Sequence, residues 1–431
     1  MRKKSEMDHP GPKAGATATG RAGPVADRSR RRFIGAAGLL AALAGCRARK
    51  PFLINPCHDP ALDALTESPW LARAWLGLAP AQVWDCHVHL AGIGDSGNGL
   101  VVGRRLMSLL HPVLYSQRLF YLNAGCVSEM PGTVDENYVR RLALLVRNMP
   151  AGVKALVFAF DWYHGDDGLP VPDRSTFYVP DDYARRVAAA QPDVFEWVAS
   201  IHPYRPDAVD RLEAAAARNA KAVKWLPAAQ NIDPGSKRCD AFFAALARLR
   251  LPLISHCGME KAAQGVSMEH FGNPLRLRRA LEAGVRVVVA HCASAGKDED
   301  LDKPGTEQTS FALFARLMEE PDWKEHLFGD ISAIVLRNRK PEIIRTLLAR
   351  DDWHGRLLNG SDYPLPGILP LISPAALASN GLLPKEAVAD LDILREHNPL
   401  YFDLALKRNL RWQGKSFPAD VFATRTFFEA A

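Results

Sequence analysis

The sequence predicts an α/β protein with a (β/α)8 barrel, because eight short apolar runs alternate with segments of helical periodicity. Eight strands joined by helical crossovers are the number that closes such a barrel. The chain has 431 residues, of which 48% are hydrophobic and 24% charged, so it can bury a large core. The expected strands are Val83–His89, Val153–Phe160, Phe195–Ile201, Ala222–Leu226, Leu253–His256, Val285–His291, Leu327–Ile331 and Leu357–Gly360.

Helical periodicity occupies most of the segments between these runs. The helices expected there are Asp207–Asn219, Ala241–Arg250, Pro274–Ala283 and Pro341–Arg350. More than sixty residues separate the first run from the second, which predicts a helical insertion at about 90–152, with helices over Gly103–Leu122 and Val134–Asn148. Its apolar side chains suit packing on the barrel, a substrate lid, a dimer interface or a membrane-facing patch, and the sequence leaves these alternatives open.

The amino-terminal segment has the order of regions found in secretory signals. Ser29-Arg30-Arg31-Arg32-Phe33-Ile34 resembles a twin-arginine (Tat) motif, and Leu43-Ala44-Gly45-Cys46 resembles a lipobox. We therefore expect residues 1–46 to be a lipoprotein-type export signal, with a lipid anchor on Cys46 and a periplasmic or cell-envelope location. A basic amphipathic helix is the alternative. The apolar run Phe33–Ala44 is too short to span a bilayer, so the lipid is the only membrane anchor expected.

The remaining chain divides by composition and charge. We interpret 47–80 as a linker and amino-terminal extension, 81–406 as the barrel and 407–431 as a carboxyl-terminal extension. Residues 1–46 carry nine basic and three acidic side chains, which accounts for the formal charge of +6. The rest is balanced, which argues against a nucleic-acid partner. Seven cysteines in a chain of this length do not indicate a disulfide framework.

Histidines and an aspartate stand at the ends of four expected strands. The first strand ends with His87-Val88-His89, and alternation along a strand places both imidazoles on the same side, at the end where barrel active sites form. His256, His291 and Asp362 end or follow the fifth, sixth and eighth strands. Such a buried cluster requires a cation, and nitrogen and oxygen ligands without sulfur suit zinc, manganese or iron(II) in an open catalytic site.

This order of motifs resembles the amidohydrolase superfamily, in the amidohydrolase-related branch that includes aminocarboxymuconate-semialdehyde decarboxylase. The resemblance covers about 80–406 and extends to Ser361-Asp362-Tyr363-Pro364 and Asn398-Pro399. It implies that one or two divalent ions, zinc in the first place, are bound. The implied ligands are His87, His89, His256 and Asp362, with His291 either on a second ion or in contact with substrate and water.

Lys224, on the fourth expected strand, shares the parity of Ala222 and should enter the barrel mouth. In binuclear relatives a lysine here is carboxylated and bridges two metals. Substrate contact and a plain ion pair are the alternatives for Lys224.

Other polar residues on the same barrel face are candidates for substrate recognition, because loops there have access and freedom to vary. They are Asp161, His164, His202, Arg205 and Asp330. Cys86, Cys257 and Cys292 each adjoin a proposed histidine, so alternation should turn them away from the site as ordinary apolar residues.

The leading functional hypothesis is hydrolysis of an amide, ester or lactone-type small molecule by a metal-activated water. Asp362 would hold the metal and accept the proton, while His291 would stabilise negative charge or orient the substrate. The first alternative is metal-dependent non-oxidative decarboxylation. The second is a lipid-anchored binding protein on a catalytically retired barrel, against which the full set of five metal-site residues argues.

Overall fold

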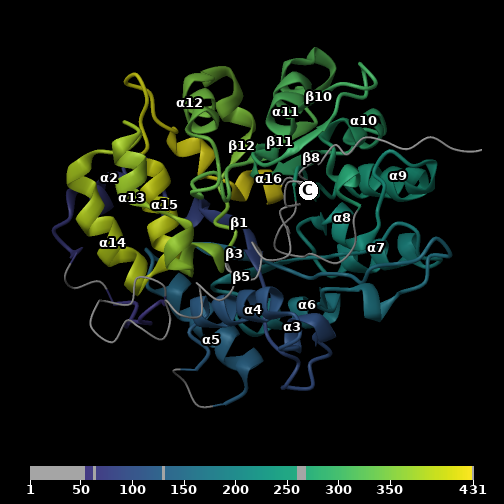
Figure 1. Ribbon diagram of the computed structural model, residues 1–431, viewed down its shortest axis with the longest axis horizontal. Coiled ribbons are helices and arrows are strands. Elements are labelled where there is room, and N and C mark those ends of the chain that lie inside the picture. The colour runs from purple at the N-terminus through teal and green to yellow at the C-terminus, as the bar shows by residue number, and fades with distance from the viewer. Residues whose placement is uncertain (1–53, 62–64, 129–131, 260–267, 430–431) are drawn as a thin grey trace, which may run out of the picture. The chain divides into compact units, whose positions relative to one another are not determined.

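The computed structural model describes residues 54–61, 65–128, 132–259 and 268–429 (Figure 1). The chain divides into residues 1–49 and a compact unit of residues 50–431. The expected export signal and Cys46 lie outside the described residues, so their assignment stays a prediction. Within the described part, no helix combines the length and apolar character needed to cross a membrane.

All eight expected strands are present and lie in two parallel sheets of order β1-β3-β5 and β12-β11-β8-β7-β6. Parallel bridges join the sheets at both seams, between Ala199 and Val223 and between Val88 and Tyr363. The predicted (β/α)8 barrel is therefore confirmed. The strands are β1 Trp84–His89, β3 Lys154–Phe158, β5 Phe195–Val198, β6 Val223–Trp225, β7 Leu253–His256, β8 Val287–Ala290, β11 Leu327–Asp330 and β12 Leu357–Leu358.

Helices surround the strands, as Figure 1 shows. The apolar residues of α12, for example, recur at helical spacing, and Ile343, Ile344, Leu347 and Leu348 are all buried. The helices beside the barrel strands are α5 Val134–Arg147, α6 Asp181–Ala190, α7 Ala208–Ala217, α8 Pro227–Gln230, α9 Asp240–Leu249, α10 Arg278–Glu282, α11 Ser310–Glu319 and α12 Pro341–Ala349. After β12 follow α13 Pro374–Ser379, α14 Val388–His397, α15 Pro399–Asn409 and α16 Arg425–Glu429.

Two helices occupy the segment expected to form one helix over Gly103–Leu122. These are α3 (Arg104–Met107) and α4 (Pro112–Ala124). Proline has no N–H to donate and is favoured in the first turn of a helix, so Pro112 separates the two. Just before α3, β2 (Val101–Val102) pairs antiparallel with β4 (Phe177–Tyr178), which connects the insertion to the loop after β3. The small β9–β10 pair (Lys297–Glu299 and Glu307–Thr309) extends the loop after β8.

A disulfide between Cys57 and Cys126 joins the amino-terminal extension to the segment after α4. It links positions 69 residues apart. The other described cysteines, Cys86, Cys239, Cys257 and Cys292, are free and buried. The described chain therefore has a single disulfide rather than a framework.

The carboxyl-terminal extension closes one end of the barrel. The barrel interior is an apolar cluster of residues from successive strands, and Phe428 of α16 belongs to it at 1% exposure. Phe427 packs edge-on against Phe328 of β11, with ring centroids 4.6 Å apart. Since β11 presents Phe328 near its amino end, α16 fills the barrel on the side opposite the histidines. The remaining cluster residues are Trp84, Cys86, Leu156, Phe158, Val198, Ala222, Ile254, Val288 and Leu358.

Candidate metal centre

A β-bulge in β1 positions His87 and His89. In the pairing with β3, Asp85 opposes Ala155 and Val88 opposes Val157, so β1 contains one extra residue. The parity therefore changes within the strand. Both histidine rings contact the interior ring of Phe158, with centroids 4.9 Å away for His87 and 5.4 Å for His89.

The bulge corrects the expectation for Cys86. On a regular strand this residue would face away from His87, but it belongs to the interior cluster together with Trp84 and Phe158. Cys257 and Cys292 pack in the other cluster, between strands and helices, as predicted, although Cys292 does so through the unusual backbone after β8 rather than through alternation. All three thiols are buried, and burial raises their pKa, which is consistent with a packing role.

His291 reaches the site through an unusual backbone conformation. Val287 and Val289 of β8 pack toward the helices, so simple alternation would send His291 the same way. Instead His291, Cys292 and Ala293 have φ angles of 56°, 48° and 49°. Three successive non-glycine residues in the left-handed region carry a conformational cost, and such strain clusters at functional sites. The His291 ring consequently lies 4.8 Å from that of His87 and 5.1 Å from that of His256.

Asp362 lies at the centre of the group. It follows β12 with a φ of 59°, and its backbone N–H donates to the His87 carbonyl at 2.8 Å. Its Oδ1 is 3.2 Å from His89 Nε2 and 3.5 Å from His87 Nε2, and its Oδ2 is 3.8 Å from His291 Nε2. One ligand atom from each of His87, His291 and Asp362 lies within 4.8 Å of the others.

The structure thus brings all five predicted residues together at the carboxyl ends of the strands. His89 joins the closest group through Asp362, and His256 joins it through the ring of His291. Their individual roles as ligands stay predictions.

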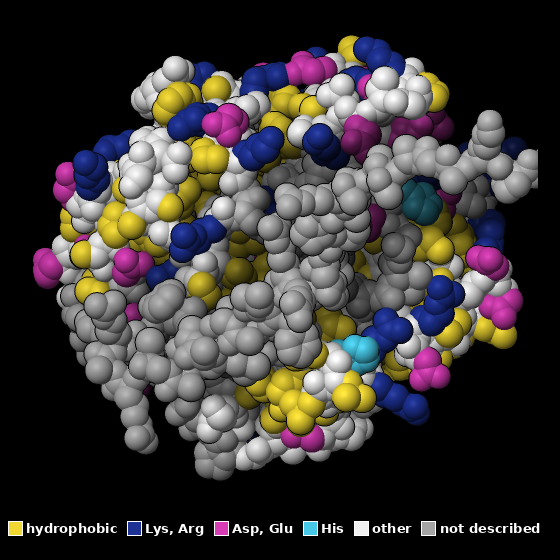
Figure 2. Space-filling view, in the orientation of Figure 1, with side chains coloured by type: hydrophobic (Ala, Val, Ile, Leu, Met, Phe, Trp, Pro, Cys, Tyr) yellow, Lys and Arg dark blue, Asp and Glu magenta, His cyan; other side chains and the backbone are white. Residues whose placement is uncertain are grey.

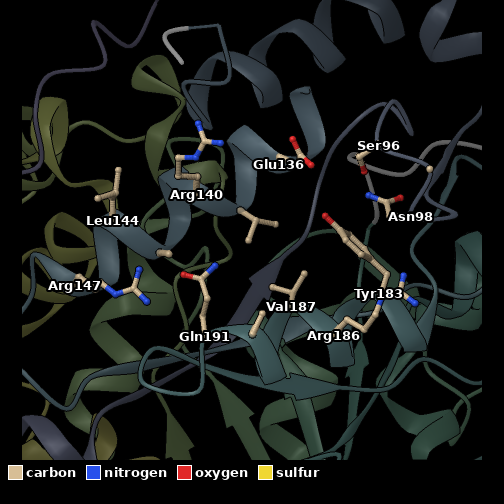
Figure 3. Close-up of a pocket in the computed structure, with 14 residues that line it drawn as sticks. Ser96, Asn98, Glu136, Arg140, Leu144, Arg147, Tyr183, Arg186, Val187 and Gln191 are labelled. Atoms are coloured by element: carbon tan, nitrogen blue, oxygen red, sulfur yellow. The ribbon is translucent and has the colours of Figure 1, made fainter. Parts of the chain in front are cut away.

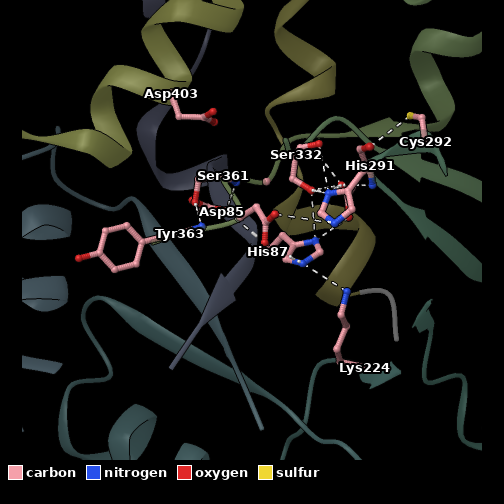
Figure 4. A network of polar contacts seen from close by, with 12 residues as sticks. Asp85, His87, Lys224, His291, Cys292, Ser332, Ser361, Tyr363 and Asp403 are labelled. Atoms are coloured by element: carbon pink, nitrogen blue, oxygen red, sulfur yellow. Dashed lines mark hydrogen bonds and ion pairs between the residues drawn. The ribbon is translucent and has the colours of Figure 1, made fainter. Parts of the chain in front are cut away.

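Asp330 orients two of the histidines. Its Oδ2 is 2.9 Å from His87 Nδ1, and its Oδ1 accepts the backbone N–H of His291 at 2.8 Å. Ser332 Oγ is hydrogen-bonded to Asp330 and lies 2.7 Å from His291 Nδ1 (Figure 4). Hydrogen bonds therefore fix the Nδ1 atoms of His87 and His291 on the side away from Asp362, and both Nε2 atoms face Asp362. The sequence predicted a substrate contact for Asp330, but the side chain is fully buried behind the histidines.

Asp85 and Lys407 support the turn that carries Asp362, and neither was predicted from the sequence. The Asp85 carboxylate accepts the N–H of Ser361 at 2.8 Å, although burial raises its pKa to about 6. Lys407 Nζ donates to the Gly360 carbonyl at 2.7 Å and to Asp403 at 2.6 Å. An aspartate within the apolar first strand was the available sequence signal for Asp85.

The donor set fits a divalent cation. Burial lowers the pKa of His87 and of His291 well below the usual histidine value, with further lowering from Lys224 and neighbouring histidines. Both imidazoles are therefore neutral at pH 7 and present a nitrogen lone pair beside the Asp362 carboxylate. Neutral imidazole held by a carboxylate behind it is the arrangement commonly found around protein-bound zinc and related ions.

Lys224 enters the same centre, as its parity predicted. Its side chain is almost completely buried, and Nζ lies 3.2 Å from His87 Nε2 (Figure 4). The amine also lies over the Phe158 ring, 5.4 Å from its centroid. Lys224 therefore stands where it can contact a bound ion or a substrate, and the choice between its proposed roles stays open.

The other four candidates for substrate recognition, Asp161, His164, His202 and Arg205, gather after β3 and β5, where the ring centroids of His164 and His202 are 4.3 Å apart. Asp161 Oδ2 accepts the N–H of His202 at 2.9 Å, and Arg205 lies 3.7 Å from Asp161 Oδ1. His202 Nε2 donates to the Gln230 carbonyl at 2.9 Å, while Nδ1 accepts from the Tyr204 N–H at 3.2 Å. Both ring nitrogens of His202 are thus occupied by main-chain groups. Of the four side chains, Arg205 is the most exposed, at 17%.

A cavity of about 610 Å³ lies away from this centre (Figure 3). It is formed between α5 and α6, on the outer side of the barrel. None of its lining residues belongs to the metal centre. The cavity and the candidate chemistry therefore occupy different parts of the fold.

The chain is similar to several solved structures at low sequence identity. They include an uncharacterized TIM-barrel protein from Bordetella bronchiseptica (16% identity, 75% of this chain and 99% of the other, TM-score 0.42). A putative 2-pyrone-4,6-dicarboxylic acid hydrolase from Pseudomonas putida is similar over 75% and 96% (16% identity, TM-score 0.40). A 5-carboxyvanillate decarboxylase from Novosphingobium aromaticivorans, complexed with manganese, is similar over 82% and 98% (11% identity, TM-score 0.42).

Comparison with curated proteins finds no match. The amidohydrolase family profile, however, matches residues 84–368, about two thirds of the chain. The matched segment begins with β1 and extends beyond Asp362, so it contains every residue of the candidate metal centre. The chain belongs to the amidohydrolase family.

Proposed function

We propose that the chain is a metal-dependent hydrolase that acts on an amide, ester or lactone-type small molecule. The observation that carries this proposal is the convergence of His87, His291 and Asp362 within 4.8 Å at the carboxyl ends of the barrel strands. We propose zinc as the ion, because two imidazole nitrogens and a carboxylate oxygen suit it in an open site. A divalent ion held there would supply Lewis-acid chemistry, since it polarises a carbonyl and lowers the pKa of water toward about 7.

Four side chains of the centre carry out proton transfer, orientation and support in the proposed reaction. Asp362 accepts a proton from the attacking water and transfers it to the leaving group. His291 presents the Nε2 lone pair on the Oδ2 side of Asp362, where it accepts a hydrogen bond from the attacking water and orients it. Asp330 and Ser332 hold the two imidazole rings, so little reorganisation is needed during the reaction.

Decarboxylation of a carboxylated substrate by the same centre is the second candidate. The observation that favours it is the buried amine of Lys224, 3.2 Å from His87 Nε2. A cation in this position can pair with a substrate carboxylate and hold it beside the metal ligands.

We also propose that the protein is exported and anchored by a lipid on Cys46. The disulfide between Cys57 and Cys126 supports export, because disulfides persist in oxidising compartments such as the periplasm.

The test is to measure the metal content of the purified protein and then to assay amide, ester, lactone and carboxylic-acid substrates in isotopically labelled water. Hydrolysis places the label in the product. Decarboxylation releases carbon dioxide and leaves the carbon skeleton unlabelled. Asp362→Asn should abolish turnover, and His291→Ala should lower kcat more than metal content, because His87, His89 and Asp362 remain to hold the ion. Tight binding without turnover of any substrate would instead support the retired-barrel alternative.

A further inference from the structure

The turn between α3 and α4 exposes several large apolar side chains. Leu109, Leu110 and Val113 are 74%, 89% and 71% exposed. Met107 on α3 and Leu119 on α4 are 45% and 46% exposed. We refer to these five residues as the α3–α4 surface. Figure 2 shows hydrophobic side chains gathered over α3 and α4 in the lower part of the view. Adjoining exposed apolar side chains of this kind mark interaction sites.

The chain segment that carries this surface has charges of one sign. Residues 96–128 contain Arg104, Arg105 and Arg118 but no aspartate or glutamate. Arg104 and Arg105 are exposed on α3. Arg118 Nη1 lies 3.0 Å from Met107 Sδ, so its charge lies directly beside the apolar side chains. Exposed apolar residues flanked by arginines match the interface of an anionic lipid bilayer, where the apolar groups enter the headgroup region and the cations attract acidic lipids.

The same charge disfavours a second copy of the chain as the occupant. A two-fold symmetric contact places a surface against itself. The arginines would then face each other without acidic partners from this segment, and such like-charge juxtaposition is costly.

The disulfide shortens the covalent path between α4 and Cys46. Cys126 follows α4 by two residues and is bonded to Cys57, which lies eleven residues after Cys46. Eleven extended residues span at most about 40 Å. A lipid on Cys46 would therefore keep the carboxyl end of α4 within this reach of the membrane, and the α3–α4 surface lies at the other end of this 13-residue helix, about 20 Å further along its axis.

We propose that the α3–α4 surface docks on an anionic phospholipid bilayer, with Leu109, Leu110 and Val113 in the headgroup region and the three arginines on acidic lipids. This contact is additional to any lipid on Cys46 and independent of the reaction that the barrel catalyses.

The test uses the full chain with Cys46→Ser, which removes lipidation, and a polarity-sensitive fluorophore on Leu110→Cys. Leu76→Cys is the matched control, because Leu76 is a leucine of comparable exposure (75%) just after helix α2 (Pro69–Ala74). The four free cysteines described are buried, so labelling is directed to the new thiol. The probe membrane is a vesicle of equal parts phosphatidylcholine and phosphatidylglycerol, with pure phosphatidylcholine for comparison.

We expect a blue shift at position 110 with the anionic vesicles and none at position 76. High salt should reverse the shift. Replacing Arg104 and Arg105 with glutamine should weaken the apparent affinity roughly fivefold per arginine.

Two outcomes would overturn the proposal. The first is an unchanged spectrum at position 110 while the chain sediments with the vesicles, because the basic leader alone would then bind the lipid. The second is a shift at position 110 that appears without vesicles and grows with protein concentration, because a second copy of the chain would then cover the surface.

Discussion

The Asp330 carboxylate lies 2.9 Å from His87 Nδ1 and at the same time accepts the backbone N–H of His291. A single buried acid thus connects β1 to the strained turn after β8. The interaction keeps the Nδ1 proton of His87 on the side of Asp330 and leaves Nε2 as the lone-pair atom toward Asp362. Acids in this position tune the metal affinity of the histidines they hold.

Asp330→Asn should lower metal affinity by about 10- to 100-fold, because an amide that donates toward Nδ1 favours the wrong tautomer of His87. The measurement is competition with a chelator, monitored by metal content. Asp300→Asn, which alters a carboxylate paired with Arg316 outside the centre, is the control and should leave affinity unchanged. The double change His87→Ala and His89→Ala gives the reference for a site without metal. Wild-type affinity in Asp330→Asn would contradict the orienting role.

Metal affinity should stay constant as the pH falls from 8 through about 6.5, the ordinary histidine pKa. Protons compete with the metal for imidazole nitrogen. Burial lowers the pKa of His87 and His291 well below the usual value, so this competition begins only at more acidic pH. Titration of apparent affinity against pH measures the onset. A steep loss beginning at about pH 6.5 would show that these imidazoles titrate as if exposed.

One metal ion per chain is the expected stoichiometry, because the described residues contain one group of three ligands within mutual reach. Carboxylation of Lys224 would add a bridging ligand beside His87 Nε2 and raise the count toward two. Metal content should therefore be compared after purification with and without bicarbonate. A second ion that appears with bicarbonate and disappears in Lys224→Ala would establish the bridging role.

Phe428→Ala should lower the free energy of unfolding by about 3–5 kcal/mol, because it removes a fully buried ring from the barrel interior. Denaturant titration gives this value. Leu76→Ala, at an exposed position, should change it by less than about 0.5 kcal/mol. A small effect at Phe428 would mean that α16 leaves the barrel end at little cost.

The fold was predictable because parallel strands buried on both faces appear as continuous apolar runs. The division at Pro112 was not predicted, although proline inside a helical pattern marks a boundary. Local signals of this kind need no knowledge of the partner strand.

The interior position of Cys86 and the approach of His291 depend on information that alternation alone lacks. The bulge is defined by the register of β1 against β3, and the His291 turn is held by Asp330 on a different strand. The disulfide was likewise not predictable from local sequence, since nothing near Cys57 in the sequence singles out Cys126 as its partner. In each case the deciding contact joins segments distant in the chain.

The bulge in β1 also determines how closely the apolar part of the barrel interior is followed by the polar part that contains the histidines. On a regular strand, an outward-facing residue separates each interior position from the next. In β1 the apolar Cys86 and the imidazole of His87 follow each other directly, and a Cβ on Gly360 would meet both residues. The apolar cluster of the barrel interior and the histidines of the metal centre are therefore in direct contact along β1. Deletion of one residue at the bulge would restore regular alternation along β1. Either the apolar residues of β1 or the histidine pair would then face out of the barrel.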